Sequence, residues 1–379
     1  MKYAIINYQN DPLPDESNTN FIEEGAFLMK SNRNRLIIMF FALIFILYAC
    51  ETKPEDNEKT HPLIDRESLI PSDAKKMTPE NDAHPPILHS DDFELPVPLP
   101  YPVNTAGLED APFILPDGNT LYFFFTPNPA MDYQAQVNDQ VSGIYVSYRE
   151  GETWSVPERV WLQEPGKLAL DGCPAVLNDV LWFCSAREGY TGVNMFTARY
   201  MEGNWTDIHY VGDQLMETYQ IGEVHPYEDK LYFHSDRPGG QGGTDIWVTT
   251  KLNGAWSEPL NIDIVNTEAN ESLPFISYDG KELWFTRTHL GTPALFRSFK
   301  GPNGWEEPEL IISNFAGEPT LDREGNLYFT HHFFEDGVMI EADIYVARRK
   351  NTTDNESQTD FSNTIMAVFE VRLYISNNP

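Results

Sequence analysis

The sequence predicts an all-β fold built from repeated antiparallel units, and three observations lead to this prediction. The triplet Leu-aromatic-Phe recurs along the chain, at 121–123, 181–183, 231–233, 283–285 and 327–329. A second run with an aromatic residue at its centre follows each triplet, around Tyr145, Phe196, Trp247, Phe296 and Tyr345. A tryptophan follows a glycine turn in four of the units, at Trp154, Trp205, Trp256 and Trp305, about 50 residues apart. This period is typical of a propeller blade, so we expect a five-bladed β-propeller of four-stranded antiparallel blades.

The third unit also carries motifs of a known family. It contains SDRPGGQGGTDIWV at 235–248 and V-N-T-x-x-x-E-x-x-P at 265–274, and D-G-x-x-L-[YW]-F hairpins occur at 117–123 and 279–285. Over residues 96–349 the chain resembles the WD40-like β-propeller repeats of TolB-type and related bacterial envelope proteins. The resemblance implies a propeller fold, with envelope proteins or cell-wall and glycan material as partners. Propellers support many unrelated activities, so the resemblance assigns none.

The first 50 residues divide into two parts at Met29. Residues 1–28 are acidic, which is unsuited to a signal peptide, so we expect a non-native N-terminal extension. Residues 29–50 combine a basic start, an apolar core too short to span a bilayer, and a lipobox-like Leu-Tyr-Ala-Cys that ends at Cys50. We expect a lipoprotein-type signal peptide and lipidation of Cys50; the alternative is a short membrane anchor. Both interpretations attach the protein to a membrane of the bacterial cell envelope, with the rest of the chain outside the cytoplasm.

Three segments are predicted downstream. Residues 51–95 are charged, rich in proline and poor in aromatic residues, which predicts a disordered tether. Residues 96–350 would form the propeller; its fifth unit lacks a G-x-W strand, and residues 96–105 can supply this outer strand and close the ring. Residues 351–379 combine a polar linker with an alternating apolar run that is typical of a half-buried strand.

Composition limits the partners. The net charge of −32, from 26 basic and 58 acidic residues, argues against nucleic acid and against an anionic lipid surface. We therefore expect membrane contact only through the N-terminal lipid or apolar segment. The sequence contains no G-x-S-x-G, H-E-x-x-H, P-loop or C-x-x-C motif, and we expect no resident cofactor and no metal-ligand set.

Two cysteines flank a hairpin whose turn is Asn178-Asp179. Counting outward from this turn places Cys173 opposite Cys184, which is within disulfide distance for neighbouring strands. An oxidising envelope compartment permits the bond, so we expect a disulfide. The alternative is a pair of buried free thiols.

Acidic residues recur at the predicted start of the innermost strands: Glu109, Asp171, Glu223 and Glu271, each three residues before proline, and Glu318, directly before proline. Loops between second and third strands would bring Arg187 and Arg237 to the same mouth of the central channel. These seven residues are our binding-site candidates. They are either clasps between blades or a site for a cation such as Ca²⁺, a sugar or a peptide. We expect at least two acids to pair with arginine, and Glu109 and Glu318 to be free.

Two enzyme classes are alternatives to a binding role. Some five-bladed propellers are glycosidases, which need two suitably spaced carboxyls, one with a raised pKa. The regular spacing of the acids here is typical of a structural repeat, and no catalytic residue stands out. Ser147–Trp154 resembles a sialidase Asp-box, with Arg149 where the aspartate belongs. We therefore expect a non-enzymatic envelope lipoprotein whose propeller binds or scaffolds its partners, with a glycan-active enzyme as the alternative.

Overall fold

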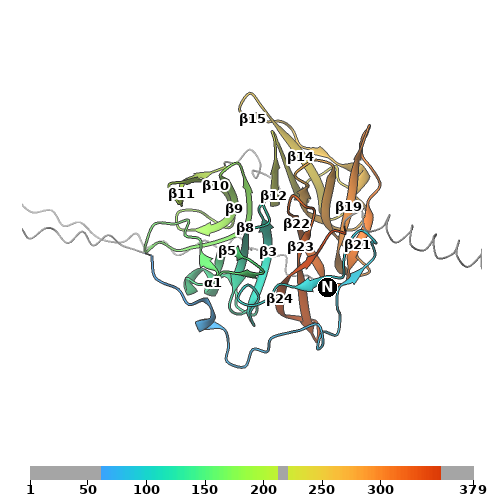
Figure 1. Ribbon diagram of the computed structural model, residues 1–379. Helices are drawn as coiled ribbons and strands as arrows, with labels where there is room; N and C mark the ends of the chain where they lie inside the picture. The colour runs from blue at the N-terminus through green and yellow to red at the C-terminus, as the bar shows by residue number, and fades with distance from the viewer. Residues whose placement is uncertain (1–60, 212–220, 351–379) are drawn as a thin grey trace, which may run out of the picture.

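The computed structural model describes residues 61–211 and 221–350, in which β-strands dominate (Figure 1). The strands pair almost entirely in antiparallel fashion, as the repeats predict. One α-helix occurs in this part of the chain, α1 (Tyr133–Asp139), together with the 3₁₀ turns η1 (Arg66–Leu69) and η2 (Asp263–Val265). No helix within the described ranges is long and apolar enough to cross a membrane.

Four sheets contain the strands. A four-stranded sheet holds β8 (Ala169–Leu177), β9 (Val180–Arg187), β10 (Asn194–Met201) and β11 (Asn204–Tyr210). A five-stranded sheet holds β12 (Ile221–Tyr227), β13 (Lys230–Ser235), β14 (Asp245–Leu252), β15 (Ala255–Trp256) and β16 (Leu260–Asn261). A six-stranded sheet holds β17 (Glu271–Ile276), β18 (Glu282–His289), β19 (Thr292–Gly301), β20 (Gly304–Trp305), β21 (Glu309–Ser313) and, at its edge, β1 (Ile87–Leu88).

The nine-stranded sheet contains two of the sequence repeats. The first comprises β3 (Leu108–Ile114), β4 (Thr120–Thr126), β5 (Gly143–Glu150), β6 (Thr153–Trp154) and β7 (Glu158–Arg159). The last comprises β22 (Ala316–Leu321), β23 (Leu327–Glu335) and β24 (Val338–Ala347), with β2 (Val97–Pro98) antiparallel to β24. A single parallel pair, between Leu108 and Ala342, joins these two repeats.

The first strands of the repeats lie side by side at the centre of the molecule. Strands β3, β8, β12, β17 and β22 each lie against the next in this order, and β22 lies against β3. The later strands of each repeat lie progressively outward (Figure 1). This is how the blades of a β-propeller are arranged.

The repeated tryptophan joins one repeat to the next. Trp205 packs edge-on against Tyr122, the middle residue of the preceding triplet, with 6.1 Å between ring centroids. Trp256 packs against Trp182 in the same way, at 6.2 Å. These contacts explain why the sequence alternates aromatic triplets with G-x-W turns: each supplies one half of an interface between blades.

The predicted disordered tether is wrong for residues 61–95. Arg66 is 5% exposed and Phe93 is fully buried, and Ile87–Leu88 pairs with the edge of β21. Phe93 packs edge-on against Trp284 at 5.8 Å, which is the place that a G-x-W tryptophan of the last repeat would otherwise take. The composition of this segment is too polar for a core of its own, but the segment completes cores and sheet edges that the repeats provide. We call residues 61–95 the N-terminal strap.

Several predictions fall on residues outside the described ranges. They concern the extension 1–28, the signal peptide 29–50 with Cys50, residues 51–60 of the tether, and the tail 351–379. By contrast, the predicted pairing of residues 96–105 with the last repeat is confirmed, because Val97 pairs with Val346 and Pro98 with Tyr345.

Replacement of Phe93 by alanine tests the role of the strap in stability. We expect Phe93→Ala to lower the free energy of unfolding by about 3–5 kcal/mol, because it removes a fully buried ring from the core. Urea unfolding followed by tryptophan fluorescence measures this change. Leu95→Ala is the control, because Leu95 is 77% exposed; equal unfolding midpoints for the two variants would contradict the role assigned to Phe93.

Candidate functional site

Three of the repeated acids are buried and paired with arginine. Asp171 accepts a hydrogen bond from Arg187 at 2.8 Å, and Glu271 accepts one from Arg287 at 2.7 Å. Glu109 accepts one from Arg66 of the strap at 3.1 Å. All three carboxylate side chains are 0% exposed. The expectation that at least two acids pair with arginine is therefore met, whereas the expectation that Glu109 is free is wrong.

The arginines occupy equivalent places although they come from different parts of the chain. Arg187 lies over Phe183 and Phe196, with 5.2 and 4.5 Å from the guanidinium carbon to the ring centroids. Arg237 lies over Phe233 and Trp247, and Arg287 over Phe285 and Phe296. In the first repeat no arginine of β3–β5 takes this place; Arg66 reaches in from η1 and lies over Phe123 and Tyr145.

Arg66 is held by more than its carboxylate partner. It also donates to the carbonyl oxygens of Pro102 and Val103, and Glu109 accepts two further bonds from Thr105, through its backbone N–H at 3.0 Å and its hydroxyl at 2.6 Å. Burial raises the pKa of Glu109 above its ordinary value, although Arg66 and Thr105 act in the opposite direction. Sequence reasoning missed Arg66 because it lies in a segment whose composition predicts disorder.

Glu223 does not occupy the place that its motif predicted. Strand pairing sets Ile221 opposite Ser235, as Asp171 is set opposite Ser185, so an isoleucine stands where the first, second and fourth repeats have an acid. Glu223 lies two residues further on, at the irregular position where the last repeat has Glu318. Pro226 follows Glu223 at the spacing of the E-x-x-P motif. The β-bulge nevertheless sets the register of β12, so the spacing to proline does not place the acid.

Arg237 lies beside Ser235, over the rings described above. In this repeat the arginine thus keeps its place on the aromatic pair, while Ile221 stands where a paired acid would be. Glu223 is therefore not the acid at the position that Asp171 holds beside Arg187.

Three carboxyl side chains, those of Asp110, Glu223 and Glu318, come together at the centre of the molecule from three of the first strands. We call this cluster of three side chains the central carboxyl group. All three side chains are half-buried. Burial is the main cause that raises the pKa of Asp110 well above its ordinary value and the pKa of Glu223 to about 8, and the charge of Glu318 raises both further. Glu318 accepts hydrogen bonds from the backbone N–H of Ala111, at 2.7 Å, and from the hydroxyl of Thr330. Glu223 therefore keeps its proton at neutral pH, which makes it a hydrogen-bond donor.

Thiol and imidazole groups border the central carboxyl group. The thiol of Cys173 contacts the carboxyl of Glu223, and His332 lies near Glu318. Burial lowers the pKa of His332, so the imidazole favours its neutral form. Within residues 61–211 and 221–350, no three His, Cys, Asp or Glu side chains are arranged to hold a metal ion.

The predicted disulfide is absent, because Cys173 and Cys184 are both free thiols. The register of β8 and β9 explains the error: Gly172, not Cys173, lies opposite Cys184, since a bulge interrupts the pairing between Gly172 and Ala175. Hydrogen bonding with Cys184 and burial raise the pKa of the Cys173 thiol well above its usual range. Counting outward from the turn assumes an uninterrupted ladder, which this strand does not have.

A second buried charge cluster lies where the strap crosses the last repeat. Lys76 contacts Glu341 and Asp343, and the backbone N–H of Met77 donates to Glu341 at 2.8 Å. Burial raises the pKa of Glu341 to about 7 and that of Asp343 well above its ordinary value, against the effect of Lys76. Neither acid belongs to the E-x-x-P motif, so the sequence analysis did not single them out.

A pocket of about 530 Å³ lies between the strap and residues 98–106. Its polar lining is largely bonded within the protein: Asn104 bonds the backbone of Leu99 and Ile344, Thr105 bonds Glu109, and Asp343 bonds Lys76. These groups hold the strap in place, so the pocket is a weaker candidate site than the central carboxyl group.

Comparisons with known proteins identify similar structures but no family. No family model and no curated protein matches the sequence. Solved structures similar to this chain include TolB from Acinetobacter baumannii, with a TM-score of 0.38, 12% identity and coverage of 66% of this chain and 56% of that one. An endo-arabinase from Bacteroides thetaiotaomicron has a TM-score of 0.45 and 17% identity, with coverage of 66% and 96%. A xylan β-1,4-xylosidase from Bacillus halodurans has a TM-score of 0.41 and 14% identity, with coverage of 68% and 55%.

The chain thus spans little more than half of the TolB structure and of the xylosidase structure. These identities and TM-scores are too low to transfer an activity to this chain.

The Asp171–Arg187 pair can be tested by removing one partner. Arg187→Ala leaves the fully buried Asp171 carboxylate without its cation, and we expect a loss of about 3–5 kcal/mol in the free energy of unfolding. Lys167→Ala is the control: it removes an exposed partner of Glu188 and should leave the free energy of unfolding almost unchanged. Similar losses in both variants, measured by urea unfolding, would show that burial does not decide the strength of the pair.

The raised pKa of Glu223 predicts a pH dependence of stability. From its ordinary value of 4.5 up to about 8, the folded state keeps the Glu223 proton while the unfolded state releases it. Stability therefore falls as pH rises through this window and levels off above it. Glu223→Gln should flatten this fall, since glutamine cannot ionise; Glu202→Gln, at an exposed position, should leave it unchanged. Urea midpoints between pH 5 and 9 provide the measurement, and parallel profiles for both variants would contradict the assignment.

Proposed function

We propose that this protein is a bacterial envelope lipoprotein whose β-propeller binds or scaffolds protein or cell-wall glycan partners without catalysing a reaction. The observation that carries the proposal is the position of the repeated acids in the structure. Glu109, Asp171 and Glu271 are three of the five acids that the sequence placed at the channel mouth, and each is fully buried in an arginine pair. A carboxylate held in this way stabilises the blades and is not available to a substrate.

The proposed architecture is a five-bladed WD40-like propeller of the TolB type, closed by an N-terminal strand. Two facts support it: the five first strands lie against one another in cyclic order, and β2 pairs with the outer side of β24. A closed ring leaves few free sheet edges and presents two broad faces, which suits a scaffold for partners.

The proposed location is the extracytoplasmic side of a membrane, with the protein anchored through lipid on Cys50. The basic start and apolar core before Cys50 support this part of the proposal. The order found in the strap shortens the tether from residues 51–95 to residues 51–60. Ten residues span at most about 36 Å when fully extended, so the propeller would stay close to the membrane surface.

A glycan-active enzyme is the second candidate, and the central carboxyl group favours it. A carboxyl that keeps its proton at neutral pH beside another acid is the combination that glycoside hydrolysis uses for its general acid. Glu223, with a pKa of about 8, would be the acid, and Asp110 or Glu318 its partner.

One set of measurements separates these proposals. Wild type and Cys50→Ala are expressed from Met29, envelope membranes are isolated, and bound partners are captured from detergent extracts. We expect wild type in the membrane fraction with specific partners, and Cys50→Ala released or unprocessed. The purified wild type is also incubated with a panel of plant and bacterial glycans. Hydrolysis that Glu223→Gln abolishes would replace the binding proposal with the enzyme.

A further inference from the structure

The third strand of most repeats places a cation over the repeated tryptophan. Arg149 pairs with Trp154 across two strands, and its guanidinium carbon lies 4.9 Å from the indole centroid. Lys251 lies over Trp256 at 5.5 Å and Lys300 over Trp305 at 5.8 Å, in the equivalent register. The cation covers one face of each indole.

The second repeat departs from this pattern. Tyr200 takes the position of the cation opposite Trp205, with 5.1 Å between the ring centroids and an interplanar angle of 59°. Tyr148 of the neighbouring repeat lies close enough for Tyr200 to contribute to its raised pKa, after burial. The almost fully buried ring of Tyr122 packs against Trp205. The junction of the first two repeats thus carries an aromatic group where the others carry a cation.

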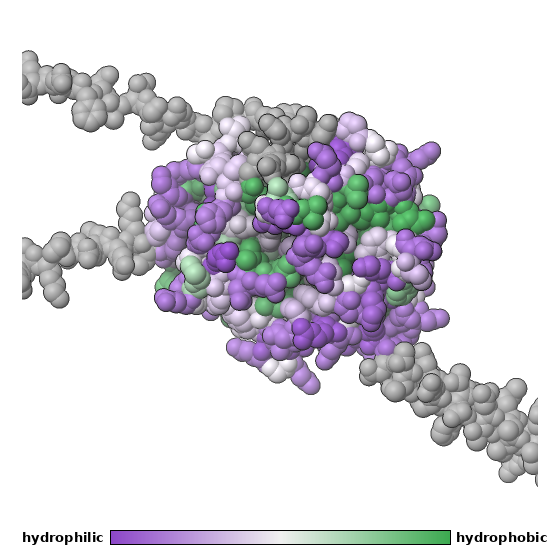
Figure 2. All heavy atoms as spheres, turned by 90° about the horizontal axis from the view of Figure 1, so that it is seen from above, coloured by the Kyte–Doolittle hydropathy of each residue, from purple (hydrophilic) through white to green (hydrophobic). Residues whose placement is uncertain are grey.

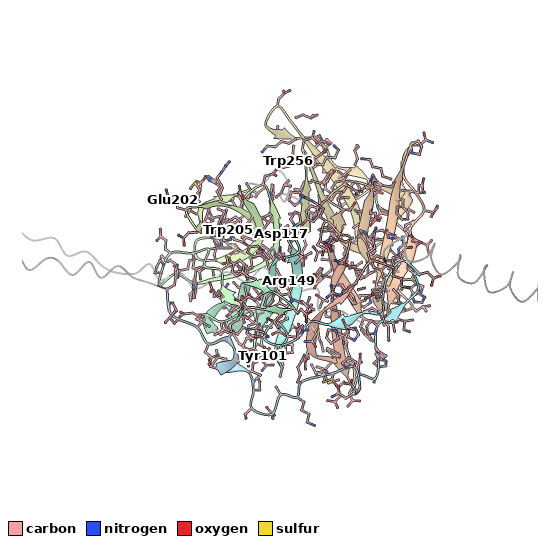
Figure 3. The ribbon with its side chains drawn as sticks, viewed as in Figure 1. Tyr101, Asp117, Arg149, Glu202, Trp205 and Trp256 are labelled. Carbon is pink, nitrogen blue, oxygen red and sulfur yellow. The ribbon has the colours of Figure 1, made fainter. Side chains whose placement is uncertain are left out.

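This aromatic group is accessible from solvent. Tyr148 is 43% exposed and Tyr200 is 44% exposed, and Trp205 is half-buried. Figure 3 shows Trp205 in the same repeat as Glu202, away from Tyr101. Figure 2 shows that hydrophobic residues lie among hydrophilic ones on the face seen from above.

Carboxylate side chains lie around the aromatic group. Glu158 lies near the phenol of Tyr148, and Glu202 is exposed on the turn between β10 and β11. Arg199, the neighbouring cation, is engaged by Asp207 at 3.5 Å. With a net charge of −32 on the whole chain, this surface repels anionic ligands.

We propose that Tyr148, Tyr200 and Trp205 form a platform that binds a neutral oligosaccharide. The apolar face of a sugar ring packs on exposed aromatic rings, while its hydroxyls bond phenol and carboxylate groups at the edge. Tyrosine and tryptophan lose little conformational entropy in such contacts. The inference rests on the proposed function and deepens it, since it names the class of glycan and a surface distinct from the central carboxyl group.

The test titrates the full-length protein in detergent with cellohexaose, xylohexaose, maltohexaose and arabinohexaose, using tryptophan fluorescence and calorimetry. An oligogalacturonate serves as the acidic comparison. We expect binding of at least one neutral oligosaccharide and weaker binding of the acidic one. Tyr200→Lys converts the second repeat to the pattern of the third and fourth, and should weaken binding at least about tenfold with the fold retained.

Lys251→Ala is the matched control, because it alters the equivalent position over Trp256 and should leave the affinity unchanged. Tyr148→Ala provides a second variant that also removes part of the platform. The proposal is overturned if wild type binds none of the four neutral sugars, if both tyrosine variants bind as wild type does, or if Lys251→Ala weakens binding equally. If wild type nevertheless captures envelope partners, the proposed function stands without this platform.

Discussion

A carboxylate that is buried in its ionised form needs a cation nearby, and this requirement governs much of the acid-bearing face. In the second and fourth repeats the cation comes from the repeat itself, as Arg187 and Arg287. In the first repeat it comes from Arg66, outside the repeats, and in the last repeat Lys76 meets Glu341 and Asp343. Arg66 and Lys76 of the strap thus pair with buried carboxylates of the first and last repeats, and these contacts hold the strap in an ordered conformation.

The same strap completes the hydrophobic side of the ring. Phe93 fills the place of the missing tryptophan against Trp284, and Arg297 and Arg349 lie over its ring. Glu282, which bonds Arg349 through both oxygens, also accepts from the indole of Trp284. Charge pairing and aromatic packing thus act together at the junction of the fourth and last repeats, where the strap crosses.

Repeat patterns predicted the architecture well because they report local burial. Aromatic triplets, turn glycines and G-x-W positions correspond to strands and to contacts between repeats, and the Asp171–Arg187 pair follows from their spacing. Predictions failed where a residue's partner is distant or where a bulge changes the register. Nothing local distinguishes Arg66 from other charged residues of the strap. Pro226 and the Asn178-Asp179 turn each suggested a register for Glu223 and Cys173 that the bulges of β12 and β8 alter.

The bulge of β22 also helps to bring Glu318 to the centre. Ala111, Cys173, Leu273 and Glu318 all have left-handed backbone conformations, with φ between 46° and 60°. Such conformations cost of order 1–3 kcal/mol each for residues other than glycine, and they re-aim the side chain out of the sheet. Glu318 thereby reaches the backbone of Ala111 in another repeat. A regular strand would have left this carboxyl in the sheet interface.

The distance along the chain between Lys76 and Asp343 has a consequence for biogenesis. The two residues are 267 positions apart, so the strap is made long before the strand that receives it. At about 5–20 residues per second of synthesis, the interval is on the order of 10–50 s, and crossing a membrane would extend it. Phe93 likewise lacks its partner until Trp284 has been made. The abundant charge and proline around Phe93 keep the strap soluble until its partner strands exist. A composition typical of disorder therefore suits a segment that becomes ordered only after the repeats have been made.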